Sequence, residues 1–326
     1  MPQINKASYE TKSAVLFVVF NRPDTTSQVF EQIRIAKPRR LYLAADGPRK
    51  NFPDDTLSCI QTKEIVQNVD WECEVKTLFR EENLGCKNGV SAAVTWFFDQ
   101  EEEGIILEDD CLPANGFFKF CDTLLEKYRN DTRIRHITGC NLQQGKKWGD
   151  GSYYFSNRTH VWGWAGWRRA WKDYDKNLDK YDANEIRDKM QNIYPDPVVV
   201  DCWVNIFKEL KEGKINSWAY QLDFINFFNN GLIIIPNENL ISNIGFRANA
   251  TNTFDVDSVF ANVPLSDIED ILDPLFIVPE KQADLFIINN HFNIEEKRRK
   301  QNLLRKKVRR WFKSTLQKAA SIMFLS

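Results

Sequence analysis

The sequence contains no run of 18 uninterrupted apolar residues, so we expect no helix that spans a membrane. Residues 1–12 are polar and lack the apolar segment that marks a secretory signal peptide. The seven cysteines are scattered without any Cys-x-x-Cys pair, which is typical of buried thiols in a reducing compartment. These absences together predict a chain that is made and kept in the cytoplasm.

The composition describes a folded protein with an uneven distribution of charge. At 326 residues, with 43% apolar and 13% aromatic side chains, the chain can build the core of one large domain or two small ones. Disordered, collagen-like and small disulfide-stapled classes are excluded. Eleven of the 44 basic residues and no acidic residue occur from Lys297 onward, so the rest of the chain holds 33 basic against 45 acidic residues. An acidic body therefore carries a basic tail.

Short apolar runs alternate with helical patterns in the first third of the chain. We expect strands at residues 14–20, 41–45, 73–79 and 104–107, with helices at 24–37, 54–68 and 88–100 between them. The continuous apolar run of the first strand indicates burial on both faces. The alternation predicts an α/β fold whose mostly parallel strands are covered by helices, and ligands bind such sheets beyond the carboxyl ends of the strands.

After residue 111 this alternation becomes less regular. Helices are expected at residues 117–129, 197–212 and 217–229, and short strands at 134–139 and 232–236. The aromatic-rich stretch 153–171 has no clear assignment, and residues 255–296 are expected to form an accessory segment against the main body.

Polar residues follow each of the first four predicted strands. They are Asn21-Arg22, Asp46-Gly47, residues 80–88 and Glu108-Asp109-Asp110. Because the carboxyl ends of parallel strands lie at one edge of a sheet, this coincidence predicts a single site there.

The triplet Glu108-Asp109-Asp110 directly follows an apolar strand. Three adjacent carboxylates repel one another, and a bound divalent cation is a common compensation. Oxygen ligands favour Mg²⁺ or Mn²⁺, which retain waters and recruit phosphate oxygens, and such a cation would neutralise a diphosphate leaving group. The alternative is a solvated acidic turn, as most acidic triplets are.

Three further segments complete a candidate nucleotide pocket. Arg22, next to Asn21, can pair with phosphate oxygens, and Asp46 can accept the imide N–H of a uracil. Lys87 lies where a helix begins, in a position that favours anions. Each segment alone also has an ordinary interpretation, as a turn or a helix cap, and the GxxxxGK[ST] phosphate loop is absent.

A set of motifs in this order resembles the GT-A nucleotide-sugar glycosyltransferases, and among them the bacterial relatives of N-acetylglucosaminyltransferase I. The resemblance spans about residues 14–253. Its motifs are Phe20-Asn-Arg-Pro23, Asp46-Gly47, Leu107-Glu-Asp-Asp-Cys-Leu-Pro113 with Phe117-Phe118, the segment 160–171, and Ser242-Asn-Ile-Gly-Phe246.

The resemblance implies a role for several residues. Asp110 would be the direct ligand of Mn²⁺ or Mg²⁺, Asp109 would approach the ribose with Glu108 beside it, Asp46 would bind uracil and Arg22 the diphosphate. The reaction would be metal-dependent transfer from a UDP-sugar with inversion, which requires a base for the acceptor hydroxyl. The implied organisation is a GT-A domain over 1–254, with a nucleotide-binding half at 12–115 and an acceptor-side half at 116–254. The accessory segment 255–296 and the tail 297–326 would follow.

The chain departs from this pattern at two places. Many relatives have Trp-Asp-Tyr-Gln where residues 218–221 read Trp-Ala-Tyr-Gln, so Ala219 replaces a carboxylate. Asp223, four residues on along a predicted helix, can substitute as the catalytic base, and Asp201 is the second candidate. Residues 247–252 read Arg-Ala-Asn-Ala-Thr-Asn where relatives often have Gly-Glu-Asp-Ala-Thr-His.

Tryptophans are concentrated at 162, 164, 167 and 171. Their faces suit the apolar side of a pyranose ring, but their spacing also fits helical packing against a core. We expect Trp162 or Trp164 to contact the donor and the others to lie in the core. His160 fits a packed or a catalytic role equally well.

The tail has an amphipathic and basic pattern. Leu304, Val308, Trp311, Phe312, Leu316 and Met323 recur at helical spacing among Lys and Arg. This pattern predicts a C-terminal helix that lies on the anionic inner face of the cell membrane, with a partner protein as the alternative. Nucleic acid is not expected as a partner, because the body is acidic and an apolar stripe has no role on a duplex.

These features predict a cytoplasmic, peripheral-membrane glycosyltransferase that moves a sugar from a UDP-sugar to a glycan or lipid-linked acceptor in surface polysaccharide synthesis. A catalytically impaired sugar-nucleotide-binding protein is one alternative. A sugar-nucleotide pyrophosphorylase is another, although it would require a Gly-rich, Arg-containing loop where the chain reads Asn21-Arg-Pro-Asp24.

Overall fold

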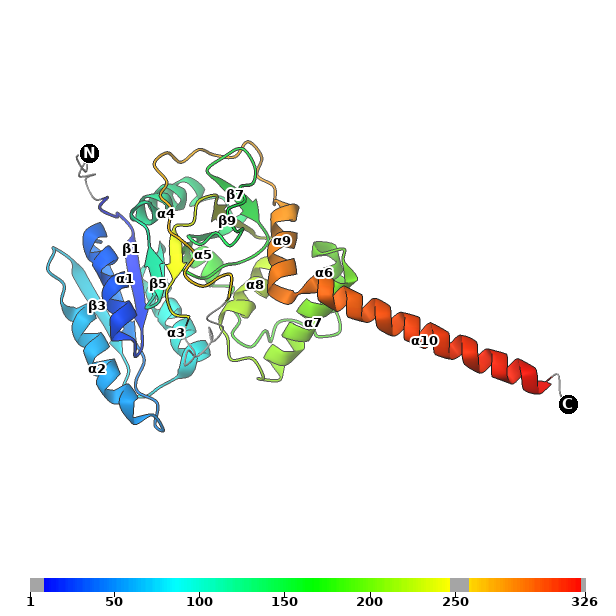
Figure 1. Ribbon diagram of the computed structural model, residues 1–326. Coiled ribbons are helices and arrows are strands. Elements are labelled where there is room, and N and C mark those ends of the chain that lie inside the picture. Colours follow the sequence, from blue (N-terminus) through cyan, green and yellow to red (C-terminus); the bar gives the residue numbers. More distant parts are fainter. Residues whose placement is uncertain (1–8, 247–257, 324–326) are drawn as a thin grey trace.

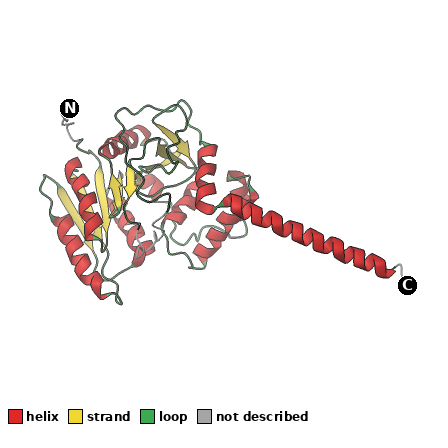
Figure 2. Ribbon diagram, in the orientation of Figure 1, coloured by secondary structure: helices red, strands yellow, loops and turns green. Residues whose placement is uncertain are grey.

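The computed structural model of the protein describes residues 9–246 and 258–323. Its centre is an eight-stranded sheet with the order β3-β2-β1-β4-β8-β6-β9-β7, and helices cover both faces (Figures 1 and 2). The first four strands are β1 (Ala14–Val19), β2 (Arg40–Ala45), β3 (Glu74–Phe79) and β4 (Glu103–Glu108), and they are mutually parallel. The α/β fold class and the four strands expected in the first third are therefore confirmed.

The alternation of side chains along β1 builds three layers. Val15, Phe17 and Val19 face the core beneath α1 (Pro23–Ala36), α2 (Pro53–Gln67) and α4 (Asn115–Tyr128). Ala14 and Leu16 face the opposite core, which α3 (Gly85–Gln100) covers. Because successive side chains of a strand point to opposite faces, a strand buried on both sides must be apolar throughout, as this one is.

Prolines mark where three helices begin. Pro23, Pro53 and Pro197 occupy the first turns of α1, α2 and α7 (Pro197–Lys211). At this position the missing N–H has no intrahelical acceptor to lose and the fixed φ suits the helix. Each of these helices follows a loop from the sheet or from another helix, so the prolines in the sequence coincide with helix starts in the structure.

The second half of the sheet is mixed rather than parallel. It contains β6 (Ile134–Thr138), β7 (Tyr153–Ser156), β8 (Trp164–Trp167) and β9 (Leu232–Pro236). β8 is antiparallel to both β4 and β6, and β7 is antiparallel to β9, whereas β6 and β9 are parallel. The aromatic-rich stretch without a clear assignment thus supplies two strands of the main sheet.

A second apolar core lies among the helices of residues 186–228. It is formed by α6 (Ile186–Ile193), α7 and α8 (Ala219–Phe228), and Trp203 lies fully buried at its centre. The short α5 (Arg168–Trp171) joins β8 to this region.

The segment expected to be accessory contributes to the core. α9 (Lys281–Phe292) packs against β7, and its Ala283 and Ile287 are buried. Asp284 of the same helix accepts hydrogen bonds from the Ser156 hydroxyl and the Asn157 backbone N–H. Residues 281–292 are therefore part of the main body.

The final helix, α10 (Ile294–Met323), leaves the body and projects away from it (Figure 1). No helix in the described part of the chain has the length and apolar character needed to cross a membrane.

Candidate functional site

The polar strand ends meet where the order of the sheet reverses. The chain runs from β1 outward through β2 to β3 and then returns to add β4 on the other side of β1. The register pairs Val18 with Glu108 and Val19 with Ala45, so these strands end at the same edge. Such a reversal leaves a crevice beyond the carboxyl ends, which is where open α/β sheets bind ligands.

Arg22 and the acidic triplet form an ion-pair group at this crevice. Arg22 Nη1 lies 2.6 Å from Asp110 Oδ2 and 3.7 Å from Asp109 Oδ1. Asp109 Oδ2 also accepts the backbone N–H of Phe20 at 3.0 Å. The three side chains are 11–19% exposed, so the group is largely shielded but open to solvent on one side.

A small second sheet lies next to Asp110 and contacts its backbone. β5 (Cys111–Pro113) pairs antiparallel with β10 (Ile241–Asn243), and the Ile244 N–H donates to the Asp110 carbonyl at 2.9 Å. Gly245 follows, and a Cβ built on it would lie 2.2 Å from Asp110 Oδ2 and 2.8 Å from Arg22 Nη1. Only glycine fits here without displacing the ion pair. Gly245 belongs to the motif at residues 242–246, from which this role was not predicted.

The environment alters the pKa values of Glu108 and Arg22. Burial and the nearby charges of Asp110 and Asp109 raise the pKa of Glu108 to about 8, which lessens the repulsion among the three carboxylates at neutral pH. Burial opposes the charge of Arg22, but Asp109 and Asp110 outweigh it and hold the Arg22 pKa above its ordinary value.

The carboxylates fit a divalent cation only in a particular way. In residues 9–246 and 258–323, no three or more His, Cys, Asp or Glu side chains gather in a cluster able to hold a metal ion. Carboxylate oxygens do suit Mg²⁺ and Mn²⁺, which often take one or two protein ligands and complete their shell with substrate phosphates and waters. The carboxylates present therefore fit a cation that binds together with a diphosphate better than a cation held by the protein alone.

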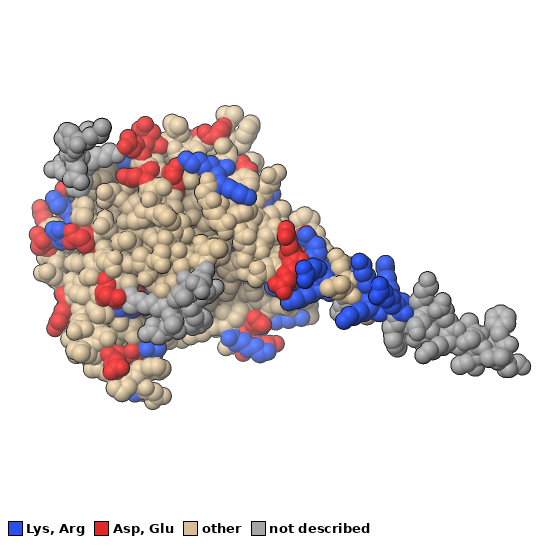
Figure 3. All heavy atoms as spheres, viewed as in Figure 1, with Lys and Arg blue, Asp and Glu red and all other residues tan. Residues whose placement is uncertain are grey.

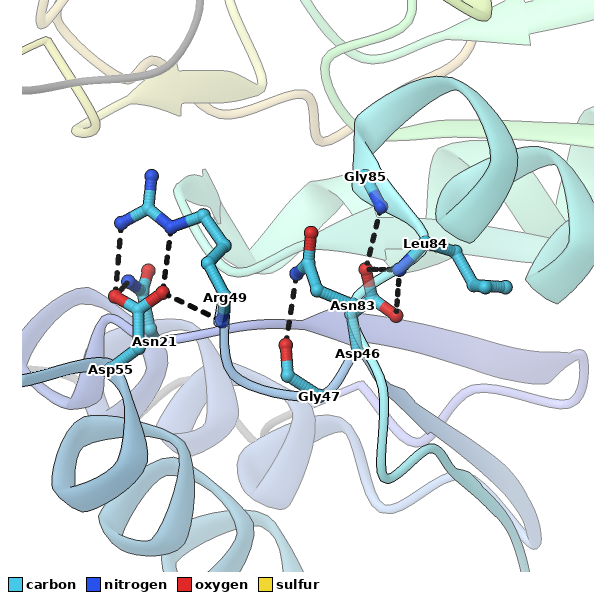
Figure 4. A network of polar contacts seen from close by, with 8 residues as sticks. All are labelled: Asn21, Asp46, Gly47, Arg49, Asp55, Asn83, Leu84 and Gly85. Carbon is cyan, nitrogen blue, oxygen red and sulfur yellow. Dashed lines mark hydrogen bonds and ion pairs between the residues drawn. The ribbon is translucent and has the colours of Figure 1, made fainter. Parts of the chain in front are cut away.

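Asp46 lies on the neighbouring strand end and caps α3 (Figure 4). Its carboxylate accepts the backbone N–H groups of Leu84 at 2.9 Å and Gly85 at 3.1 Å. Burial raises the Asp46 pKa above its ordinary value, although these N–H groups favour the charged form. Asn83 donates to the Gly47 carbonyl at 2.9 Å, so the loops after β2 and β3 are joined.

Asn21 contacts a second ion pair, formed by Arg49 and Asp55, which the same view shows (Figure 4). Its amide donates to Asp55 Oδ1 at 2.7 Å, and Arg49 binds both Asp55 oxygens, at 2.6 and 2.9 Å. The Arg49 hydrogen bonds are the main reason why the Asp55 pKa is lowered. The structure therefore gives Asn21 a supporting contact, and Arg49 and Asp55 were not singled out because their pairing depends on a turn that the sequence does not specify.

Lys87 points to a different part of the surface. Its Nζ lies 3.4 Å from the Asn177 side-chain oxygen, and burial together with the charge of Lys176 lowers its pKa. No contact joins it to the Arg22–Asp110 group in the described part of the chain. A role of Lys87 in donor binding therefore stays a prediction.

The tryptophans divide between the core and the site. Trp164 is 3% exposed and stacks on His136 with ring centroids 4.8 Å apart, so its predicted contact with the donor is corrected to a core role. Trp167 and Trp171 are also buried, as expected. Trp162 is only partly buried and meets Phe246, the residue after Gly245, edge to face at 5.7 Å. Trp162 is thus the tryptophan beside the site.

His160 has a structural position. It is 8% exposed, and its carbonyl is hydrogen-bonded to His136 Nε2 at 2.8 Å. Burial and the charge of Arg158 hold the His160 pKa well below its ordinary value. It behaves as a packed, neutral histidine.

Both predicted bases have ion-pair partners of their own. Asp223 is 4% exposed, pairs with Arg158 at 3.2 Å and accepts the Thr159 N–H at 3.0 Å. Asp201 lies on α7 and pairs with Arg187 at 2.7 Å. The helical spacing predicted a shared face but not these partners, and a catalytic role for either residue stays a prediction. The departure at residues 247–252 lies outside the described residues.

No known protein family and no curated protein matches the chain. Among solved structures, it is similar to a UDP-glucose pyrophosphorylase complexed with UDP-glucose, at 10% identity and a TM-score of 0.36, over 69% of this chain and 90% of that one. It is also similar to HddC from Yersinia pseudotuberculosis, at 10% identity and a TM-score of 0.30, over 49% and 80% of the two chains. Similarities this low support no inference about function, which must come from the residues themselves.

Proposed function

We propose that the protein is a metal-dependent, inverting glycosyltransferase that moves a sugar from a UDP-sugar to a glycan or lipid-linked acceptor. The observation that carries this proposal is the Arg22–Asp110 ion pair, which lies beyond the carboxyl ends of β1 and β4 where the sheet order reverses. The cationic Arg22 is complementary in charge to a diphosphate, and the anionic Asp110 is complementary to the metal ion that accompanies it.

The ion pair accounts for how such a ligand is bound. Arg22 would exchange Asp110 for diphosphate oxygens, and Asp110 would turn to the cation that accompanies them. The bound cation would neutralise charge on the departing UDP. Asp109 would approach the ribose, and Asp46, at the adjacent strand end, would accept the uracil imide N–H.

The acceptor side is defined less completely. Trp162 and Phe246 offer aromatic faces beside Asp110, which suit the apolar side of a sugar ring. Ala219, at the start of α8, has no group that can take a proton. This favours a second candidate, a protein that binds the sugar nucleotide and turns it over poorly.

Donor turnover in a panel of UDP-sugars with Mn²⁺ tests the proposal. Wild-type protein should release UDP slowly from one donor, and faster with the right acceptor, whereas Asp110→Asn should lose release. Asp188→Asn is a matched control, because it removes the same charge from an exposed position on α6 and should retain wild-type release. Binding of UDP without release would favour the second candidate, and formation of a UDP-sugar from UTP and a sugar 1-phosphate would indicate a pyrophosphorylase. Absence of both binding and turnover would overturn the proposal.

A further inference from the structure

The C-terminal helix has features that the sugar-nucleotide site does not require. Among the described residues, the contacts of this helix with the body come from its first two turns. Arg298 pairs with Asp196, Lys297 approaches Cys202 Sγ at 3.3 Å, and Gln301 reaches Asp201 at 3.5 Å. The 22 residues from 302 to 323 extend beyond these contacts for about 33 Å (Figure 1).

The projecting part is strongly basic. Arg305, Lys306, Lys307, Arg309 and Arg310 are exposed, and no ion pair joins them to an acidic side chain in the described part of the chain. Figure 3 shows basic side chains concentrated on the projecting helix, with acidic side chains beside them at the end next to the body. The helix therefore carries a positive charge that the protein itself does not neutralise, although its body has an excess of acidic residues.

The same segment exposes the apolar side chains of Val308 and Phe312 on one face and that of Leu303 on another. Val308 is 45% exposed and Phe312 is 55% exposed, four residues further on and so on the same face. Gln301, which contacts α7, lies seven residues before Val308, so this apolar face continues the face that packs against the body. Lys306 and Arg310 lie on the opposite side of the helix.

A helix of this kind has a limited choice of partners. Repulsion between the basic surfaces disfavours pairing of two α10 helices, and a nucleic-acid duplex would leave the apolar face in water. A bilayer interface with anionic headgroups satisfies both faces, because the basic side chains meet lipid phosphates while the apolar side chains enter the headgroup–acyl boundary.

We infer that α10 binds the surface of an anionic lipid bilayer and lies along it. This goes beyond the proposed glycosyl transfer and is tested without any enzymatic readout. The basic side chains supply attraction over distance, and Val308 and Phe312 supply the inserted apolar contact. The first two turns, fixed to α7, connect this anchor to the enzyme body.

Co-sedimentation of the full chain with vesicles tests the inference. In 0.15 M salt, wild-type protein should bind vesicles of phosphatidylcholine and phosphatidylglycerol at 3:1 at least tenfold more tightly than vesicles of phosphatidylcholine alone. The quadruple variant R305Q/K306Q/R309Q/R310Q should bind the anionic vesicles at least tenfold more weakly than wild type. The variant V308S/F312S, which keeps every charge, should also bind more weakly.

The matched control removes four exposed basic residues from the body. The variant R39Q/K172Q/K189Q/K208Q changes the net charge by the same amount and should bind as wild type does. Equal loss in both quadruple variants, equal binding to both kinds of vesicle, or no binding to anionic vesicles would overturn the inference. So would sedimentation velocity that shows a dimer dispersed by V308S/F312S, or an RNA that binds the helix where vesicles do not. Circular dichroism of each variant verifies that its helix content is retained.

Discussion

Replacing Gly245 by alanine tests the geometry of the site with a single added carbon. The new Cβ would lie 2.2 Å from Asp110 Oδ2, 2.7 Å from Asp110 Cβ and 2.8 Å from Arg22 Nη1. Contacts this short do not occur in folded proteins, so the Asp110 side chain must move by about 1 Å to restore ordinary separation. Its backbone cannot move with it freely, because the Asp110 carbonyl is bound to the Ile244 N–H.

A displacement of this size has a large effect on the proposed ligand and a small one on stability. Misplacing a binding group by about 1 Å can cost on the order of 100-fold in rate, or about 2.7 kcal/mol. The Asp110 side chain is 15% exposed and can turn toward solvent, so the free energy of unfolding should fall by less than about 1 kcal/mol. This variant should therefore lose UDP affinity while it keeps most of its free energy of unfolding.

Isothermal titration with UDP and Mn²⁺, together with urea unfolding, measures both effects. Gly245→Ala should weaken UDP binding by about 100-fold. Gly213→Ala is the control, because its Cβ would meet nothing within 4 Å while its φ of +69° strains an alanine. It should lose about 1 kcal/mol of stability and bind UDP normally. Unchanged UDP affinity in Gly245→Ala would refute the reasoning.

Three further predictions concern residues outside the ligand contacts. Asp122→Ala should lower the free energy of urea unfolding by about 2–3 kcal/mol, because Asp122 accepts hydrogen bonds from the side chains of Tyr9 and Thr11 and from two backbone N–H groups; a loss under about 0.5 kcal/mol would contradict this. Burial lowers the His136 pKa to about 4 from an unfolded value near 6.5, so the wild type should lose about 2 kcal/mol between pH 7 and pH 5 relative to His136→Gln. The stability deficit of that variant should therefore narrow on acidification, and a constant deficit would show that the histidine is not buried as described. Trp164→Phe should cost about 1–2 kcal/mol of stability and leave UDP affinity unchanged, whereas a large fall in affinity would return Trp164 to the site.

The sequence predicts the parts of the fold that local patterns determine. β1 was predicted from an apolar run, and α1, α2 and α7 were predicted from helical patterns to within one residue of their observed starts at Pro23, Pro53 and Pro197. The shared edge of the parallel strands brought Arg22 and Asp110, 88 residues apart, into one predicted site.

Elements that depend on contacts between residues far apart in the sequence had no local pattern from which to predict them. β5 and β10 are three residues each and exist only because Cys111 meets Asn243 across the chain. α9 was hidden in a segment without clear periodicity, and its burial depends on Ser156 and Asn157 from another part of the chain.

The roles of single polar residues were the hardest to predict. Helical spacing placed Asp223 on a candidate face but could not foresee Arg158, 65 residues earlier, which neutralises it in the core. The turn at Asp46 was recognised, whereas its hydrogen bonds to the start of α3 arise only when the loops after β2 and β3 come together. Side-chain roles follow from tertiary partners, which lie beyond the reach of local sequence patterns.

Calorimetric titration of UDP into wild-type protein and Asp110→Asn, each with and without Mn²⁺, tests the central claim most directly. The claim is that Asp110 and Arg22 share a metal–diphosphate ligand at the ends of β1 and β4. It predicts binding to the wild type that requires Mn²⁺ and is lost in Asp110→Asn. UDP binding that is independent of Mn²⁺ and equal in the two proteins would contradict it.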